Sequence, residues 1–229
     1  MATIADNLQA VRARVEAARG TRDVPSQVTL LAVSKAQGAE RIREAHAAGQ
    51  NAFGENYVQE AVQKMQRLEE MRLPPLEWHL IGPLQSNKTR AAAERFDWVQ
   101  TLASERIARR LSERRPAQLP PLNVLIQVNV SGEQTKNGVA PGQVKALANA
   151  IRSLPRLRLR GLMAIPEPGA DRARFHAAKL LFDELKSEFG FDTLSMGMSD
   201  DMELAIAEGA TMVRIGAAIF GAREQKSAA

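Results

Sequence analysis

The sequence contains no cysteine, which excludes disulfides, thiolate catalysis and cysteine-ligated metal sites. It contains no apolar run of about 18 residues either, so a membrane-spanning helix is not expected. Aromatic residues make up only 4% of the chain and the arginines are spread over several expected helices, so the formal charge of +5 does not indicate a nucleic-acid-binding surface. The remaining composition, with 45% hydrophobic and 25% charged residues, is that of an ordinary soluble globular protein.

Histidine is also scarce. His46, His79 and His176 lie far apart and lack a metal-binding spacing such as HExxH, so no metal site is expected. The first residues, MATIADNLQAVRARVEAARG, show helical spacing rather than the apolar core of a signal peptide. A cytoplasmic location is therefore expected.

Short β-rich segments alternate with longer segments of helical periodicity along the whole chain. The strands are expected to begin near Val28, Asn51, Glu77, Trp98, Asn123, Leu157, Thr193 and Thr211. Runs such as VTLLAV and NVLIQV are continuously apolar, which is typical of parallel strands covered on both faces. Eight strands with seven intervening helices predict a single (β/α)8 TIM barrel with an extra N-terminal helix, and residues 1–229 are expected to form one domain.

A doubly wound open sheet is the alternative fold. The glycine-rich GxGxxG turn that often follows the first strand of such a sheet is missing here. The sequence therefore favours the barrel, in which chemistry collects at the C-terminal ends of the strands.

The first expected strand, in residues 28–35 (VTLLAVSK), ends in Lys35. Burial of an ammonium group removes its hydration and favours the neutral, nucleophilic amine that forms an imine with an aldehyde. A lysine whose charged head reaches water along its apolar stem is the structural alternative. The position of Lys35 alone leaves both interpretations open.

Polar residues also stand at the ends of the last two expected strands. Ser199 is expected at the N-cap of a helix, and Gly216 follows the last strand with no side chain to block its backbone N–H. Both are suited to hold a phosphate, although a plain cap and a plain turn explain them equally. Arg214 lies within the strand segment VRIGAAIF, where a buried guanidinium needs an acceptor: a carboxylate or a ligand's ring nitrogen. His79 is expected to be a hydrogen-bonded structural residue.

Five motifs occur in a characteristic order: AVSK, FGENYVQE, WHLIGPLQSNK, GLMAI and SMGMSDDMELAIAEGATMVRIGAAIFG. In order and separation they resemble the YggS/PROSC family of pyridoxal phosphate homeostasis proteins, over almost the entire chain. The resemblance implies a barrel similar to the N-terminal domain of alanine racemase and pyridoxal 5′-phosphate as the cofactor. It places a Schiff base on Lys35, the ring nitrogen against Arg214 and the phosphate near Ser199 and Gly216, with Asn56 lining the same mouth to orient the cofactor or the lysine by a hydrogen bond.

One departure from the family is visible after the lysine. Family members often continue as SKTKP, whereas this chain reads Ser34-Lys35-Ala36-Gln37-Gly38. The lysine that the resemblance assigns to the Schiff base is kept, but a neighbouring cation is missing. A secondary lysine role at that loop is therefore not expected.

Two functions follow from the resemblance. One is a protein that holds pyridoxal phosphate as a lysine Schiff base and serves its intracellular homeostasis and delivery to dependent apoenzymes, its transient recipients, without substantial turnover. The other is a small pyridoxal phosphate-dependent amino-acid racemase. An arginine at the ring nitrogen donates to it and disfavours pyridinium formation, which argues against aminotransferase-like chemistry but not against racemisation.

The racemase alternative needs a second acid/base group. Alanine racemase takes that group, a tyrosine, from an additional β-domain across a dimer. This chain has a single tyrosine, Tyr57, at the start of the helix expected after the second strand. A monomeric binding protein, not an enzyme, is therefore expected.

Overall fold

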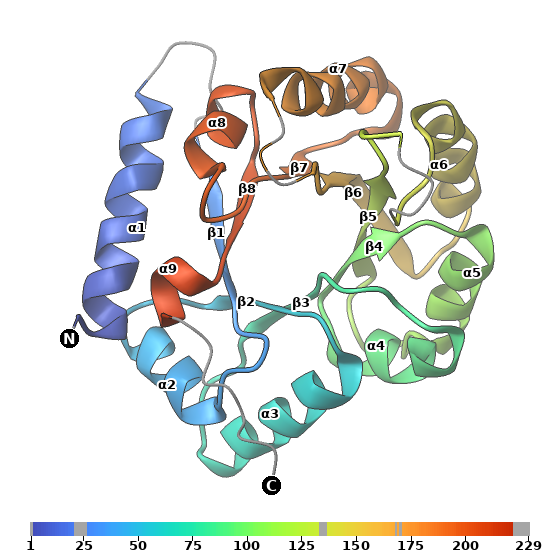
Figure 1. Ribbon diagram of the computed structural model, residues 1–229. Coiled ribbons are helices and arrows are strands. Elements are labelled where there is room, and N and C mark those ends of the chain that lie inside the picture. The colour runs from blue at the N-terminus through green and yellow to red at the C-terminus, as the bar shows by residue number, and fades with distance from the viewer. Residues whose placement is uncertain (1, 21–26, 133–136, 168, 170, 222–229) are drawn as a thin grey trace, which may run out of the picture.

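Eight parallel strands form a closed barrel in the order β1 to β8, with helices around the outside (Figure 1). The computed structural model describes residues 2–20, 27–132, 137–167, 169 and 171–221. The strands are β1 (Thr29–Val33), β2 (Ala52–Glu55), β3 (Glu77–Leu80), β4 (Trp98–Leu102), β5 (Leu122–Val128), β6 (Leu157–Ala164), β7 (Thr193–Ser195) and β8 (Met212–Ile215). The predicted (β/α)8 barrel is confirmed, and the doubly wound alternative is wrong because β1 pairs with β8 and closes the sheet.

The helices follow the predicted alternation. They are α1 (Ile4–Arg19), α2 (Ala39–Ala47), α3 (Val58–Glu70), α4 (Thr89–Arg95), α5 (Glu105–Arg114), α6 (Val144–Arg152), α7 (Arg172–Phe189), α8 (Met202–Ala207) and the short α9 (Ala217–Phe220), with 3₁₀ turns at Ser86–Lys88 and Pro141–Gln143. None of the helices in the described ranges is long and apolar enough to cross a membrane.

Local sequence signals set the ends of several helices. Thr3 accepts a hydrogen bond from the Asp6 amide, and the Asp6 carboxylate accepts one from the Thr3 amide, so the capping box before α1 is formed. At the other end of the chain, α7 stops at Gly190, whose φ of 68° lies in the left-handed region that glycine adopts without strain.

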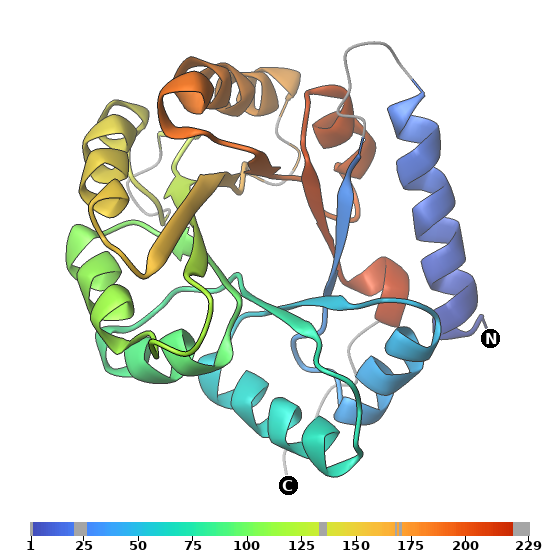
Figure 2. The ribbon, with the colours of Figure 1, turned by 180° about the vertical axis from the view of Figure 1, so that it is seen from behind.

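The N-terminal helix covers the last part of the barrel wall. α1 lies beside α8, α9 and α2 in both views of the ribbon (Figures 1 and 2). Its buried face consists of Ile4, Leu8, Val11 and Val15, which recur at helical spacing. This packing fixes α8 and α9, the two elements that flank β8, and so supports one side of the barrel mouth.

Candidate functional site

Lys35 lies in the turn that follows β1, at the C-terminal mouth of the barrel. The strand itself ends at Val33, so Lys35 stands two residues beyond the strand end rather than closing it. The next residue, Ala36, has a φ of 60°, which is costly for a residue with a Cβ. The turn is held by two backbone donors: Gln37 N donates to Ser34 O at 3.0 Å, and Ala36 N donates to a Glu60 carboxylate oxygen at 2.6 Å.

A buried ion pair lies directly behind this turn. Lys64 Nζ donates to Glu55 Oε1 at 2.7 Å and to Ser34 O at 2.7 Å, and it is 2.6 Å from Glu60 Oε1. Ser34 Oγ donates to the same Glu55 oxygen at 2.6 Å. Burial raises the pKa of Glu55, while the nearby Lys64 ammonium acts in the opposite direction. These groups anchor both neighbours of Lys35.

A cavity of about 320 Å³ opens at the mouth next to Lys35. Lys35, Val33, Gly216 and Ala217 are among the residues that line it. Gly216 leaves room there because a Cβ on it would lie 3.3 Å from Val33 O. The N–H groups at the start of α9 have no carbonyl one turn earlier within that helix. The lining of this cavity therefore combines a lysine from the turn after β1 with backbone donors from the segment after β8.

Ser199 lies in the turn between β7 and α8 and does not line this cavity. The expectation that Ser199 caps the helix is wrong, because the N-cap of α8 is Asp201. The Asp201 carboxylate accepts from the amide of Met198, and this bond keeps residues 198–201 in a turn. The helix therefore starts later than expected. The Ser199 carbonyl accepts from Arg14 of α1 at 3.3 Å.

Asn56 follows β2, the strand beside β1, at the same mouth. Its Oδ1 is buried and accepts no hydrogen bond from any described residue. An unpartnered buried acceptor is costly, and in native proteins it points to a missing donor. Asn56 therefore has the free hydrogen-bonding capacity that a ligand-facing or lysine-facing residue needs.

Arg214 is almost completely buried in β8, two residues before Gly216. Its Nη1 donates to Ser195 Oγ at 2.8 Å and its Nη2 donates to Ala164 O at 3.0 Å. Within the described part of the chain, its guanidinium forms no ion pair with a carboxylate. Burial lowers the pKa of Arg214 to about 10, so the group still carries its charge at neutral pH. A direct carboxylate partner, one of the two expected acceptors, is thus not observed.

The five predicted residues are therefore brought together to different degrees. Lys35 and Gly216 line one cavity, Asn56 and Arg214 lie on the flanking strands β2 and β8, and Ser199 stands apart in the turn before α8. Lys136, to which the sequence assigns no role, lies outside the described residues.

Comparison with known proteins identifies the family of this chain. The sequence matches the family described as alanine racemase, N-terminal domain, over residues 6–224. A pyridoxal phosphate homeostasis protein of Pseudomonas aeruginosa is 59% identical, and the match covers 98% of this chain and 97% of that protein. A protein of the same name from Escherichia coli is 55% identical over 98% of both chains. The chain belongs to the pyridoxal phosphate homeostasis protein family.

Solved structures place this family member next to PipY of Synechococcus elongatus. PipY, in its structure with pyridoxal phosphate bound, is 38% identical in sequence and superposes with a TM-score of 0.83. The match covers 96% of this chain and 100% of PipY. An alanine racemase from Corynebacterium glutamicum, at 18% identity, shares the fold with a TM-score of 0.73; the match covers 99% of this chain and 62% of the racemase. The resemblance drawn from the motifs is confirmed.

Two functional elements of this family member were missed by sequence reasoning. The sequence analysis assigned no role to Lys64, yet it follows Ala61 by three positions and precedes Leu68 by four, so it lies on the apolar face of α3. For Ser195, the sequence pattern indicated no role beyond its position at the end of a strand. Its importance comes from Arg214, which lies on the neighbouring strand and meets it only in the folded barrel.

Proposed function

We propose that this chain binds pyridoxal 5′-phosphate as a Schiff base with Lys35 and serves its intracellular homeostasis and delivery, without substantial catalytic turnover. The observation that carries the proposal is the mouth cavity lined by both Lys35 and Gly216. The names of the relatives and the cofactor in PipY support the choice of ligand.

The residues present fit this cofactor. Lys35 offers the amine, and Gly216 with the first amides of α9 offers donors for the phosphate. Asn56 has a buried acceptor without a partner, and Arg214 is a donor-only group two residues from Gly216. Ser199 supplies a hydroxyl on the adjacent turn, and we place it beside the phosphate rather than in the lysine cavity.

The bound cofactor supplies an aldehyde that exchanges between amines. The neutral amine of Lys35 forms the carbon–nitrogen bond, and the aldehyde oxygen leaves as water with the two amine protons. The reverse exchange with the lysine of an apoenzyme transfers the cofactor without oxidation or reduction. Apoenzymes that depend on pyridoxal phosphate (PLP) are therefore proposed as transient recipients. We also propose that the protein is a monomer, because the barrel mouth is then accessible to these recipients.

Turnover of amino acids would need more than Lys35. Racemisation removes a proton from one face of the substrate and returns one to the other, so it requires two positioned acid/base groups. Tyr57 is the N-cap of α3, its side chain is 65% exposed and it makes no capping hydrogen bond, so packing does not hold its hydroxyl in place. Arg214 is already protonated near neutral pH, so it cannot accept a proton and does not serve as a base.

The first test is an absorbance spectrum of the purified protein with and without added pyridoxal phosphate, followed by borohydride reduction and peptide mapping. We expect a visible imine band and a reduced adduct on Lys35. An adduct in the wild-type protein on another residue would contradict the assignment of Lys35.

The second test separates delivery from catalysis. The loaded protein is mixed with a cofactor-free PLP-dependent enzyme, and the recovery of that enzyme's activity is followed. Free amino acids are assayed in parallel for racemisation, transamination and decarboxylation. Transfer without turnover is expected. Steady turnover that survives further purification and is lost in Lys35→Ala would favour the racemase alternative.

A further inference from the structure

A continuous chain of hydrogen bonds runs through the inside of the barrel from Arg214 to Glu77. Arg214 Nη1 is 2.8 Å from Ser195 Oγ, and Ser195 Oγ is 2.7 Å from Gln100 Oε1. Gln100 Nε2 is 2.9 Å from His79 Nδ1, and His79 Nε2 is 2.7 Å from Glu77 Oε1. Ser195 on β7 and Gln100 on β4 are three strands apart, so their bond crosses the barrel interior.

The cationic end fixes the direction of the first bonds. A guanidinium has donors only, so Ser195 Oγ must accept from Arg214. The single hydroxyl proton of Ser195 is then free to point to Gln100, whose Oε1 accepts it. Because the three middle side chains are fully buried, no water replaces these partners.

The anionic end fixes the same direction independently. The hydrogen bond from His79 lowers the pKa of Glu77, which keeps it a carboxylate that only accepts. Burial lowers the pKa of His79, which keeps its ring neutral with one N–H. That N–H must lie on Nε2, toward Glu77, so Nδ1 must accept from Gln100 Nε2.

Gln100 is the one side chain that satisfies both halves. Its carbonyl oxygen faces the serine hydroxyl and its NH₂ group faces the imidazole, and the same NH₂ lies 3.1 Å from Met212 Sδ. The imidazole of His79 stacks on Trp98 with ring centroids 5.0 Å apart, which fixes its plane. A carboxylate or an alkyl group at position 100 would break the sequence of donors and acceptors.

Every donor in this chain therefore points from the buried cation toward the carboxylate. We propose that Glu77, His79, Gln100 and Ser195 are positioning residues for Arg214, which relay the counter-charge of Glu77 across the barrel and fix the guanidinium that faces the cofactor's ring nitrogen. The relay replaces the direct carboxylate partner that Arg214 lacks. Aligned hydrogen bonds polarise one another in a low-dielectric interior, which strengthens such a chain. The part that concerns the ring nitrogen rests on the proposed function.

The first experiment examines the cofactor-free protein by ¹⁵N nuclear magnetic resonance. In the wild type we expect His79 to be protonated on Nε2 alone and the Arg214 guanidinium protons to exchange slowly with water. Ser195→Ala should speed that exchange by about tenfold or more, the factor that corresponds to the loss of one hydrogen bond to a charged group, and Gln100→Leu should also speed it because Ser195 then loses the acceptor of its hydroxyl proton. Glu77→Gln should act in the same direction and populate the other His79 tautomer.

Two further variants control this experiment. Glu94→Gln removes the same charge from an exposed position of α4 and should leave the Arg214 exchange unchanged. Ser195→Ala removes the first acceptor with a smaller change of volume, so it tests the relay if Gln100→Leu does not fold. Unchanged exchange in both Ser195→Ala and Glu77→Gln would overturn the relay.

The second experiment measures the affinity of the same variants for pyridoxal phosphate and for its carbocyclic analogue, in which C–H replaces the ring nitrogen. The wild type should prefer pyridoxal phosphate, and Gln100→Leu and Ser195→Ala should reduce this preference by about fivefold to tenfold. Equal losses for both ligands would mean that these residues only support packing, and would overturn the positioning role.

The outcomes also separate the two proposals. A wild type that binds both ligands equally would refute the placement of the ring nitrogen against Arg214, while the exchange data on the cofactor-free protein would still decide the relay. A wild type that binds neither ligand would refute the proposed function itself.

Discussion

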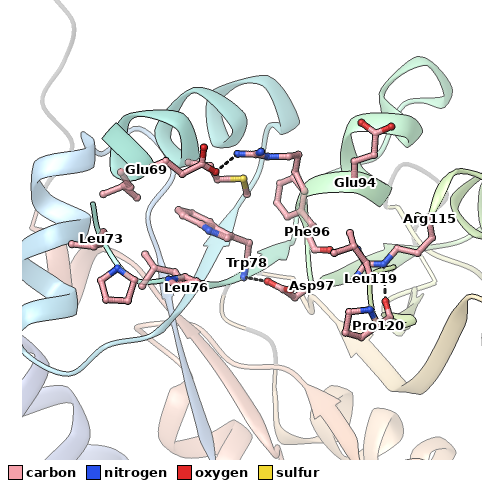
Figure 3. Close-up of a pocket in the computed structure, with 15 residues that line it drawn as sticks. Glu69, Leu73, Leu76, Trp78, Glu94, Phe96, Asp97, Arg115, Leu119 and Pro120 are labelled. Atoms are coloured by element: carbon pink, nitrogen blue, oxygen red, sulfur yellow. Dashed lines mark hydrogen bonds and ion pairs between the residues drawn. The ribbon is translucent and has the colours of Figure 1, made fainter. Parts of the chain in front are cut away.

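The two ends of the barrel contrast in how their polar groups are used. The N-terminal end carries a cavity of about 390 Å³ between α3, α4 and the segments that lead into β3 and β5 (Figure 3). Trp78, Phe96, Leu73 and Leu119 form its apolar lining, whereas the mouth cavity beside Lys35 measures about 320 Å³. Size alone would therefore not select the end at which we propose the ligand binds.

The buried polar groups of this basal cavity all have hydrogen-bond partners among the described residues. Asp97 Oδ2 accepts from Trp78 N at 2.8 Å, and Arg115 donates to the Pro120 carbonyl at 2.8 Å (Figure 3). Arg115 also donates to the carbonyls of Ala93 and Phe96, at 2.8 and 2.7 Å. These bonds join the end of α4 to the entries of β4 and β5. The polar side chains of the basal end therefore serve to connect backbone segments to one another.

At the mouth, by contrast, hydrogen-bonding capacity is left over. Asn56 Oδ1 and Glu55 Oε2 are buried without a partner among the described residues, and the first amides of α9 have no carbonyl one turn earlier in that helix. The difference teaches that unmet hydrogen bonds, rather than volume, distinguish the end at which we propose the ligand binds. It also predicts that substitutions at the two ends fail in different ways.

The largest effect is expected directly beneath the mouth, for Lys64→Met. Removing the ammonium leaves the buried Glu55 carboxylate without its cation, with the Ser34 hydroxyl still donating to it, and removes one of two donors to the Ser34 carbonyl. The loss of one partner of a buried ion pair should lower the free energy of unfolding by about 3–5 kcal/mol. Urea denaturation of the cofactor-free protein measures it.

The matched control is the double variant Lys64→Met with Glu55→Gln, which removes both charges. It should be more stable than the sum of the single losses predicts, because the two residues interact directly. Strict additivity would show that the pair contributes nothing to the support of the Lys35 turn.

At the basal end, Arg115→Met should lower the free energy of unfolding by about 2–4 kcal/mol, because buried backbone carbonyls lose their donor. The affinity for pyridoxal phosphate should stay within about twofold of wild type, since the substitution leaves the mouth intact. Arg114→Met, at the neighbouring exposed position, is the control and should change neither quantity. A large loss of affinity in Arg115→Met would break the contrast between the two ends.

The positions of the strands, and hence the two ends of the barrel, could be predicted well from the sequence. Each strand starts within one residue of the predicted position, because parallel strands covered on both faces are continuous apolar runs with clear limits. Barrel closure then places Lys35, Asn56 and Gly216 at one mouth without further information.

The parts that could not be predicted depend on register across the barrel. Ser195 meets Gln100 only because strands three apart in the wall face each other across the interior. The start of α8 was misplaced because Asp201 bonds back to Met198 and delays the helix, a local competition that the capping pattern does not reveal. Long-range pairing and competing turns are thus what the linear pattern leaves out.

Lys35→Ala is expected to have the opposite pattern to Arg115→Met: a loss of cofactor affinity with almost no loss of stability. Lys35 is only half-buried and its turn is held by its neighbours, so the stability of the cofactor-free protein should change by less than about 0.5 kcal/mol. The affinity for pyridoxal phosphate should fall at least about tenfold, which corresponds to about 1.4 kcal/mol. Lys145→Ala, at an exposed surface ion pair, is the control. A large fall in the melting temperature of the cofactor-free variant would make Lys35 a structural residue instead.

The smallest effect is expected for Ser199→Ala. A hydroxyl that donates to the phosphate contributes about 1 kcal/mol, so the variant should lose about fivefold in affinity for pyridoxal phosphate and almost none for pyridoxal, which lacks that group. Competition binding with the two ligands measures the ratio, and Ser153→Ala on the exposed surface should leave it unchanged. Because Ser199 lies outside the lining of the Lys35 cavity, equal losses for both ligands would move the phosphate entirely to Gly216 and α9. The ligand end would then be narrower than proposed, with its anion held by backbone groups alone.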